Sequence, residues 1–558
     1  MSVANPVLHL PSPAQIAEGV RAITPADLSK SPLLGILGVI IGAGIVTLTG
    51  RMIGLGLADL KGHVGVGFDA GAWIGTGYDM ALMFIGPFTV YLGGLMGARR
   101  ILLFAATAFT VICTLLPFVH NYALLIVAIA LGGLASGTFY PLTLTFALRN
   151  IPLRFLPFTI ALYATFVDGA VNIAPTLYGW YRDHLSWHWM FWNSALITPI
   201  MMFCIYYGIP DTPAPKPSSE APSFTGFLYA SAGLAMLLGA FEQGERLDWW
   251  RSGVFTALFA GGSFFLLCAL LRRLRSPNPL VDMPYLRQWN TILLGVLLFL
   301  FRFCLVTTII LIPQSLAVHG FESDQIGPAV IWSAVPLLLV TFVVALLLLA
   351  NVDARLLLAS GFALMALACC LNAGMTSAWS ASNYYRTELL TGVGQGFAFI
   401  GLVSAIVLQG IFSGGLSKPQ WILTLSAYFH TVRLFGGTIG AVAMGHYIAH
   451  QEKLHSNLLG LHVESGNWTT NANIQGLTAG LFSHSAGLAA ATGRSVGIVA
   501  SRLRLQAYTL SVIDGFLLVA WSCVCALILV ALLRNSPLTY GDLSAIQQGL
   551  AADKESKS

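Results

Sequence analysis

Long apolar runs are the feature of this chain that most restricts its fold. A helix needs about 20 mostly apolar residues to cross the roughly 30 Å hydrocarbon core of a membrane. Fourteen runs of about that length can be counted along the sequence. They lie near 32–57, 71–97, 100–118, 122–148, 155–180, 188–209, 224–243, 253–271, 290–317, 325–350, 355–374, 383–412, 421–449 and 508–534. Because lipid cannot satisfy backbone polar groups, the sequence predicts an all-α integral membrane protein.

The composition excludes the other large classes of protein. Only 9% of the 558 residues are charged, whereas about a quarter are charged in soluble proteins. The net charge of +5 gives no case for nucleic acid, since membrane proteins collect Lys and Arg in cytoplasmic loops. The chain has no phosphate-binding loop, no nucleophile motif and no clustered metal ligands. We therefore expect neither an enzyme nor a cofactor or metal site.

The distribution of basic residues predicts the orientation. An even number of spans places both termini on one side, where sixteen Lys and Arg fall against eight on the other. By the positive-inside rule that side is the cytoplasm. The predicted organisation begins with an N-terminal tail (1–31) and a six-helix bundle (32–209). Linkers at 210–289 follow, and they contain an inserted pair of spans at 224–271. A second six-helix bundle (290–534), which includes an outer loop at 450–507, and a C-terminal tail (535–558) complete the chain.

Several segments resemble one transporter family, in the right order. GAWIGTGYDMALMFIGPFTVYLGGLMGARRILLF (71–104) resembles the second span and following loop of the major facilitator superfamily. ERLDWWRSG (245–253) and SPNPLVDMPYLRQWN (276–290) are similar to segments flanking the inserted spans of its fourteen-span drug:proton antiporter-2 family. The chain is identified on these segments as a member of that family, of the EmrB/QacA-like type.

The resemblance implies a fold, an activity and partners. The fold would be two pseudo-symmetric six-helix bundles plus two inserted helices, alternating access around a midplane site. The activity would be proton-coupled efflux of small amphipathic compounds across the bacterial inner membrane. EmrB-like relatives work with a periplasmic adaptor and an outer-membrane channel. The loop 450–507 is therefore either an adaptor contact or a partly ordered outer loop.

Some family positions are altered. In the loop after the second span, Gly97, Arg99 and Arg100 match the family's gating loop, but Gly94 stands where an Asp is usual. Thr49 stands where many relatives carry a first-span Asp. Proton coupling therefore cannot be assigned from the family's usual positions.

Ionisable residues at membrane depth are costly and so are functional candidates. Asp168, Asp79 and Glu388 are the candidates for proton coupling. Asp168 and Arg433 lie thirteen and twelve residues beyond the cytoplasmic ends of equivalent spans, which places both near the midplane. Asp168 is the leading proton carrier, because a protonated acid avoids the cost of a buried charge.

The remaining membrane-depth candidates concern substrate binding or gating: Arg51, Arg302, His430, Arg433, Arg386, Trp73 and Tyr78. Each has a plainer alternative, such as a hydrogen bond to a carbonyl group, a snorkelling side chain or ordinary aromatic packing. Arg51 and Asp79 lie at similar depth, so a static ion pair between them is an alternative to a substrate role.

The prediction is a transporter that exports small amphipathic molecules. One alternative is a proton-coupled carrier of an endogenous organic anion, such as a siderophore, fatty acid or aromatic acid, because four arginines lie at membrane depth. An alternative of another class is a transport-inactive membrane scaffold or sensor, which the altered family positions would suit.

Overall fold

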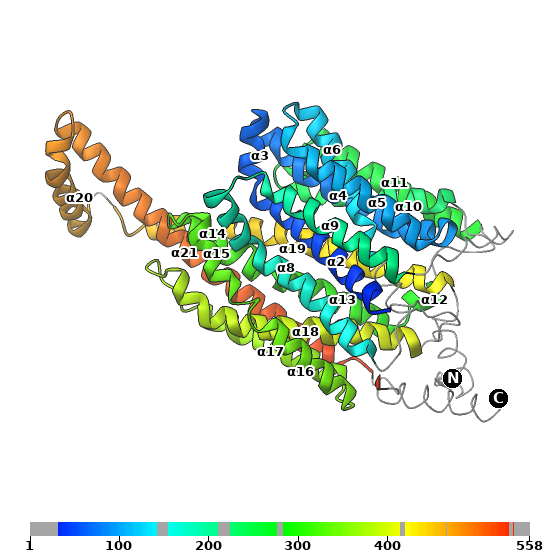
Figure 1. Ribbon diagram of the computed structural model, residues 1–558. Helices are drawn as coiled ribbons and strands as arrows, with labels where there is room; N and C mark the ends of the chain where they lie inside the picture. Colours follow the sequence, from blue (N-terminus) through cyan, green and yellow to red (C-terminus); the bar gives the residue numbers. More distant parts are fainter. Residues whose placement is uncertain are drawn as a thin grey trace, which may run out of the picture.

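The computed structural model describes residues 32–141, 155–209, 224–275, 283–412, 419–464, 466–534 and 539–540. Every regular element within these ranges is a helix. Eleven of the described helices are long and apolar enough to cross a membrane. They pack side by side in one bundle (Figure 1), which confirms the prediction of an all-α, multi-pass membrane protein. The N-terminal tail and the linker at 210–223 lie outside the described residues, as does nearly all of the C-terminal tail.

Six long helices and one short helix form the first half of the bundle. They are α2 (Pro32–Leu55), α3 (Leu57–Val64), α4 (Phe68–Met96), α5 (Ala98–Leu115), α6 (Tyr122–Gly137), α8 (Leu156–His184) and α9 (Trp189–Gly208). Helix α2 packs against α8 and α9, and α4 packs against α6. The approach of α2 to α9 requires glycine, since a Cβ atom at Gly208 would lie 2.0 Å from the nitrogen of Gly35. We call the end of the bundle where α2 begins the proximal end, and the opposite end the distal end.

The inserted pair comprises α10 (Phe224–Gly244) and α11 (Gly253–Arg275). Helix α10 packs against α11, α4 and α19, so it is an integral neighbour of both halves. Helix α11 lies at the edge of the bundle beside α10 (Figure 1). It buries only Phe255 and Gly262, which leaves most of its apolar surface for lipid.

The second half contains more interrupted helices. Its elements are α12 (Met283–Leu286), α13 (Trp289–Cys304), a π-helical turn (Thr307–Leu311), α14 (Ile312–Val318), α15 (Ser323–Ile331), α16 (Leu337–Leu349), α17 (Ala354–Asn372), α18 (Tyr385–Phe412), α19 (Pro419–Gly460), α20 (Trp468–Leu481) and α21 (Leu488–Ala531). The predicted run 325–350 is not one continuous α-helix, because tighter i→i+3 hydrogen bonds, such as Ser333 N–H to the Val330 carbonyl, replace the α-helical pattern between α15 and α16. Pro336 lies at this break, and proline both lacks an N–H donor and clashes with the preceding turn.

The predicted outer loop at 450–507 is largely helical. Helix α19 continues to Gly460, α20 follows, and α21 already begins at Leu488, well before the predicted span at 508–534. Figure 1 shows α20 and the first part of α21 projecting from the distal end of the bundle. The 44 residues of α21 correspond to about 66 Å, twice the thickness of the hydrocarbon core. We call the segment 450–507 the distal hairpin.

Candidate functional site

Three charged side chains approach one another in the middle of the bundle. They are Asp168 on α8, in the first half, and Arg302 on α13 and Arg433 on α19, in the second half. Asp168 and Arg433 are 2% and 4% exposed. Asp168 interacts electrostatically with both arginines. The structure thus brings Asp168 and Arg433, which the sequence placed near the midplane, together with Arg302, which the sequence also placed at membrane depth.

These three groups retain unused hydrogen-bonding capacity. Within the described part of the chain, neither carboxylate oxygen of Asp168 has a hydrogen-bond partner, and Nε and Nη1 of Arg302 have none. Buried polar groups in proteins are normally satisfied, and an unsatisfied one costs about 1–3 kcal/mol. The free oxygens of Asp168 and the free N–H groups of Arg302 can therefore bind a proton or a substrate group without first breaking a hydrogen bond.

Aromatic rings enclose Arg433. Its Nη2 donates a hydrogen bond to the hydroxyl of Tyr140, and its guanidinium carbon lies 3.8 Å from the centre of that ring. The Tyr140 hydroxyl also bonds the Thr47 hydroxyl on α2. The ring of Tyr163 stands edge-on to Tyr140, with 6.5 Å between the ring centres. A cation against an aromatic face gains about 2 kcal/mol when desolvated, so this cluster orients Arg433 firmly.

His430 lies one turn before Arg433 and joins the two halves. It is 2% exposed, and its Nε2 lies 3.4 Å from the carbonyl oxygen of Leu82 on α4. A Cβ atom at Gly86 would lie 2.1 Å from Nε2, so the imidazole fills the space that Gly86 leaves. This contact matches the plainer alternative for His430, a buried ring held by a carbonyl group.

Further polar contacts connect the halves along α8. Asn172 donates to Gln395 on α18 over 2.9 Å, and the hydroxyl groups of Thr165 and Thr341 are bonded to each other. At the distal end, Nη2 of Arg182 lies 3.1 Å from a carboxylate oxygen of Glu322. The central cluster is therefore bounded by contacts that must break and reform if the halves rock against each other.

Arg51 and Asp79 have different partners from each other. Arg51 donates to the carbonyl oxygen of Ile309 over 3.0 Å, in the π-helical turn of the second half. Asp79 instead interacts electrostatically with Glu242 on α10. Among the described residues, Arg51 and Asp79 form no ion pair. Similar depth did not bring them together, because depth does not determine which helix face a side chain occupies.

The two aromatic candidates on α4 have different partners. The guanidinium group of Arg246, beyond the end of α10, lies 5.7 Å from the ring centre of Trp73. Arg246 also bonds Asp69 over 2.9 Å, so Trp73 belongs to a clamp between α4 and the inserted pair. Tyr78 is buried and bonds the hydroxyl of Ser136 on α6 over 2.8 Å.

Arg386 and Glu388 lie on different faces of α18. Arg386 is exposed near the distal end of the bundle. Glu388 is 0% exposed, and neither of its carboxylate oxygens has a hydrogen-bond partner within the described residues. Only Glu388 therefore keeps the features of a buried functional group.

At the proximal end, Gly97 alone separates α4 from α5. Its φ of +90° lies in the region that favours glycine, so this tight connection depends on the residue type. Arg99 covers the ring of Tyr206 at 4.4 Å and lies 3.5 Å from the Ile209 carbonyl oxygen. Arg100 is exposed. The predicted gating loop is thus a single-residue turn with Arg99 packed on α9.

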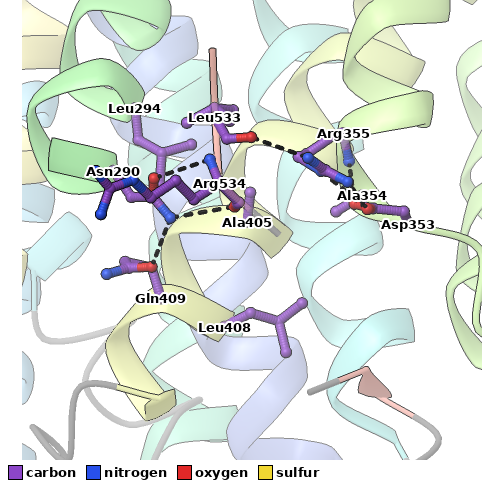
Figure 2. Close-up of a pocket in the computed structure, with 10 residues that line it drawn as sticks. All are labelled: Asn290, Leu294, Asp353, Ala354, Arg355, Ala405, Leu408, Gln409, Leu533 and Arg534. Carbon is purple, nitrogen blue, oxygen red and sulfur yellow. Dashed lines mark hydrogen bonds and ion pairs between the residues drawn. The ribbon is translucent and has the colours of Figure 1, made fainter. Parts of the chain in front are cut away.

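A second proximal cluster was missed in the sequence analysis (Figure 2). Asp353, at the start of α17, accepts hydrogen bonds from Nε and Nη2 of Arg355 over 2.9 and 2.6 Å. Nη1 of Arg355 donates to the carbonyl oxygen of Leu533 beyond α21, while Asn290 binds the backbone of Arg534. We call these five residues the proximal clasp. An Asp followed two residues later by Arg, directly before an apolar run, is the signal in the sequence that marks it.

The Asp353 carboxyl is held in its ionised form. Partial burial opposes ionisation, but the hydrogen bonds from Arg355 outweigh it and lower the pKa of Asp353. The clasp lines a small cleft of about 30 Å³ between the proximal ends of α13, α17 and α18. This volume has room for about one water molecule, so the clasp holds helix ends together and is no substrate site.

Comparisons with known proteins agree with this architecture. The family model of the Major Facilitator Superfamily matches residues 39–441. The chain is 23% identical over 465 residues to the probable multidrug resistance protein EmrY of Escherichia coli, covering 81% of this chain and 87% of EmrY. It is 23% identical over 273 residues to the fatty acid resistance protein FarB of Neisseria gonorrhoeae, covering 48% of this chain and 53% of FarB.

Among solved structures, the fold is similar to that of the proton:xylose symporter XylE bound to 6-bromo-6-deoxy-D-glucose. The TM-score is 0.54 at 11% identity, covering 92% of this chain and 98% of XylE. At this identity the likeness concerns the fold alone.

Proposed function

The chain belongs to the Major Facilitator Superfamily of secondary transporters, and from this premise we propose that it exports small amphipathic compounds in exchange for protons. The similarity to EmrY supports export of the multidrug type. A fourteen-span organisation is part of the proposal. Helices α4, α19 and the pair α15–α16 would supply the three spans beyond the eleven already described. The proximal end would face the cytoplasm of a bacterial cell, as the basic residues indicate.

The unpaired carboxyl group of Asp168 is the observation that carries the coupling. When Asp168 is ionised, its charge offsets one of the two positive charges of Arg302 and Arg433 nearby, which favours binding of the substrate. When Asp168 is protonated, the charges of the two guanidinium groups are no longer offset, which weakens binding of the substrate, so that a proton displaces it. Proton and substrate thus compete for one state of the site, which is the requirement for antiport.

The lining of the site suits flat, amphipathic molecules. Tyr140 and Tyr163 offer ring faces and edges next to the guanidinium group of Arg433. Aromatic rings bind apolar surface and also accept cations and polar edges. Recognition by such a surface depends on shape and polarity more than on one fixed set of hydrogen bonds.

A second candidate function is export of an organic anion. The unused N–H groups of Arg302 favour it, because guanidinium binds carboxylates in a bidentate manner. The name of FarB, a fatty acid resistance protein, supports the same class of substrate. Arg302→Gln separates the two candidates. Loss of transport confined to anionic compounds favours the anion carrier, and equal loss for cationic compounds excludes it.

We also propose that the distal hairpin is the contact for a periplasmic adaptor protein that leads to an outer-membrane channel. Large apolar side chains lie exposed along it: Leu461, Trp468, Phe482 and Leu488 are 65%, 80%, 55% and 65% exposed. Exposed apolar patches beyond the membrane are typical of protein interaction sites.

The test of the proposed function is substrate accumulation in cells. A chemically diverse panel is measured in cells with and without the protein, and again after the proton gradient has been collapsed. Lower accumulation that depends on both the protein and the gradient supports proton-coupled export. No difference for any compound would instead favour a scaffold or sensor.

A further inference from the structure

Glu388 lies in a second buried polar site, separate from the central cluster. Its side chain is fully buried on α18, and neither carboxylate oxygen has a hydrogen-bond partner among the described residues. Thr391 and Gly392 follow at i+3 and i+4, so they share its helix face. An unpaired buried carboxylate is costly unless a proton or another cation neutralises it.

The break between α15 and α16 lies against this face. The carbonyl oxygen of Ser333 would be 2.0 Å from a Cβ atom at Gly392, so the segment at the break packs directly on α18. Pro336 has no N–H group, which deprives the Trp332 carbonyl of its usual helical donor. Broken helices of this kind provide backbone oxygens for coupling ions in transporters.

Two hydroxyl groups lie beside the Glu388 carboxylate. The side chains of Ser333 and Thr391 lie within interaction range of its carboxylate. The hydroxyl of Ser333 donates its hydrogen to the Val330 carbonyl over 2.7 Å, and that of Thr391 donates to the Thr387 carbonyl over 2.8 Å. Each hydroxyl has one hydrogen, for which its nearby carbonyl and the Glu388 carboxylate compete, and each hydroxyl oxygen keeps lone pairs that can bind a cation. Carboxylate and hydroxyl oxygens therefore gather at this point.

The surroundings supply no counter-charge. Cys369 on α17 and Tyr384 before α18 are the titratable groups that feel the charge of Glu388. The Tyr384 hydroxyl is engaged with Ser315 over 3.2 Å. Arg386 is exposed on another face of α18, and no ion pair of Glu388 occurs within the described ranges.

We propose that Glu388, Ser333 and Thr391, with carbonyl oxygens of the 332–336 break, form a binding site for sodium ion. Hard cations prefer carboxylate, hydroxyl and carbonyl oxygens, which are the groups gathered here. The carboxylate supplies the balancing negative charge. The site lies on different residues from the Asp168 cluster, and sodium binding stands or falls independently of the proposed transport function.

The test uses the purified full-length protein in detergent at constant ionic strength. Sodium chloride is exchanged for choline chloride or potassium chloride, and the thermal unfolding midpoint is measured. Sodium should raise the midpoint saturably, since a ligand that binds only the folded state stabilises it. In weakly buffered solution at a pH where Glu388 is protonated, sodium should also release up to one proton per chain.

Variants make the test specific. Glu388→Gln should abolish both the sodium-dependent rise and the proton release, while Asp168→Asn should keep both. Ser333→Ala retains the carboxylate and should weaken sodium binding by about tenfold, the loss of one ligand of ~1.4 kcal/mol. It keeps the proposal testable if Glu388→Gln does not fold. An equal sodium effect in the wild type and in Glu388→Gln would overturn the proposal. So would a midpoint that responds to pH but not to sodium, because the site would then bind only a proton.

Discussion

Asp168→Asn is the substitution that most directly examines the proposed coupling. Asparagine has nearly the shape of aspartate but cannot exchange a proton. Because the carboxylate of Asp168 is 2% exposed and lacks hydrogen-bond partners, the substitution breaks no hydrogen bond in the described structure. It also breaks no ion pair within 4 Å among the residues that the structure describes. We therefore expect far less destabilisation than the ~3–5 kcal/mol that follows when one partner of a buried ion pair is removed.

The expected effect on transport is large and follows from the driving force. Each pH unit across the membrane is worth about 1.4 kcal/mol per proton, a tenfold concentration ratio. With one proton exchanged per substrate, a gradient of two units supports a ratio of about 100. Without a titrating group at position 168 this ratio should fall to one. Substrate exchange across the membrane without a gradient should continue at a lower affinity, since the aromatic lining remains.

The assay uses proteoliposomes loaded with substrate and subjected to an imposed pH gradient. Gradient-driven movement and gradient-free exchange are measured on the same preparation. Asp69→Asn is the matched control, because Asp69 is an exposed carboxylate on α4 that pairs only with Arg246 in the described structure. Gradient-driven transport by Asp168→Asn at the rate of the control would refute the reasoning. Loss of exchange together with coupling would place Asp168 in substrate binding instead.

Three further predictions concern other parts of the structure. Tyr140→Phe removes the hydroxyl that accepts a hydrogen bond from Arg433. Loss of a hydrogen bond to a charged group costs ~1.5–3 kcal/mol, so substrate affinity in an equilibrium binding assay should fall by about 10- to 150-fold. Unchanged affinity would contradict the proposed site. Gly97→Ala places a side chain at a φ of +90° and should lower the free energy of unfolding by about 1–3 kcal/mol in thermal melts. Because the folded-state pKa of Asp353 is lowered, its contribution to stability is present above the ordinary aspartate pKa and is lost as the pH falls through the folded-state value. Asp353→Asn should therefore narrow the difference in melting temperature between neutral and acidic pH, and an unaltered pH profile would argue against the Arg355 contact.

Most of the fold was accessible from the sequence because membrane helices carry a strong apolar signal. The runs at 32–57 and 155–180 correspond closely to α2 and α8. The helices of the distal hairpin were not predicted, because the segment 450–507 carries no long apolar run and was expected to be an outer loop. Residues 488–507 nevertheless contain many alanine, leucine and arginine residues, which favour helix.

The candidate site was accessible only in part. Counting residues from helix ends brought Asp168 and Arg433 to the same depth, and the structure places them near enough to interact electrostatically. The same counting suggested Arg51 with Asp79, whose side chains have different partners. Depth follows from a rise of about 1.5 Å per residue, but the direction of a side chain depends on how the helices rotate when they pack. Pro336 was visible in the sequence, yet only the packed structure shows that its break meets Glu388.

Because α21 is one continuous helix, movement at one of its ends is transmitted to the other end. One helix runs from the distal hairpin to the Leu533 and Arg534 backbone groups that Arg355 and Asn290 hold. An α-helix resists bending strongly, so a tilt of about 5° over its ~66 Å length moves one tip by roughly 6 Å relative to the other. A protein that binds the hairpin and tilts it would therefore displace the end of α21 that lies at the proximal clasp. A partner bound to the distal hairpin and the hydrogen bonds of the proximal clasp would therefore act on the two ends of one rigid helix.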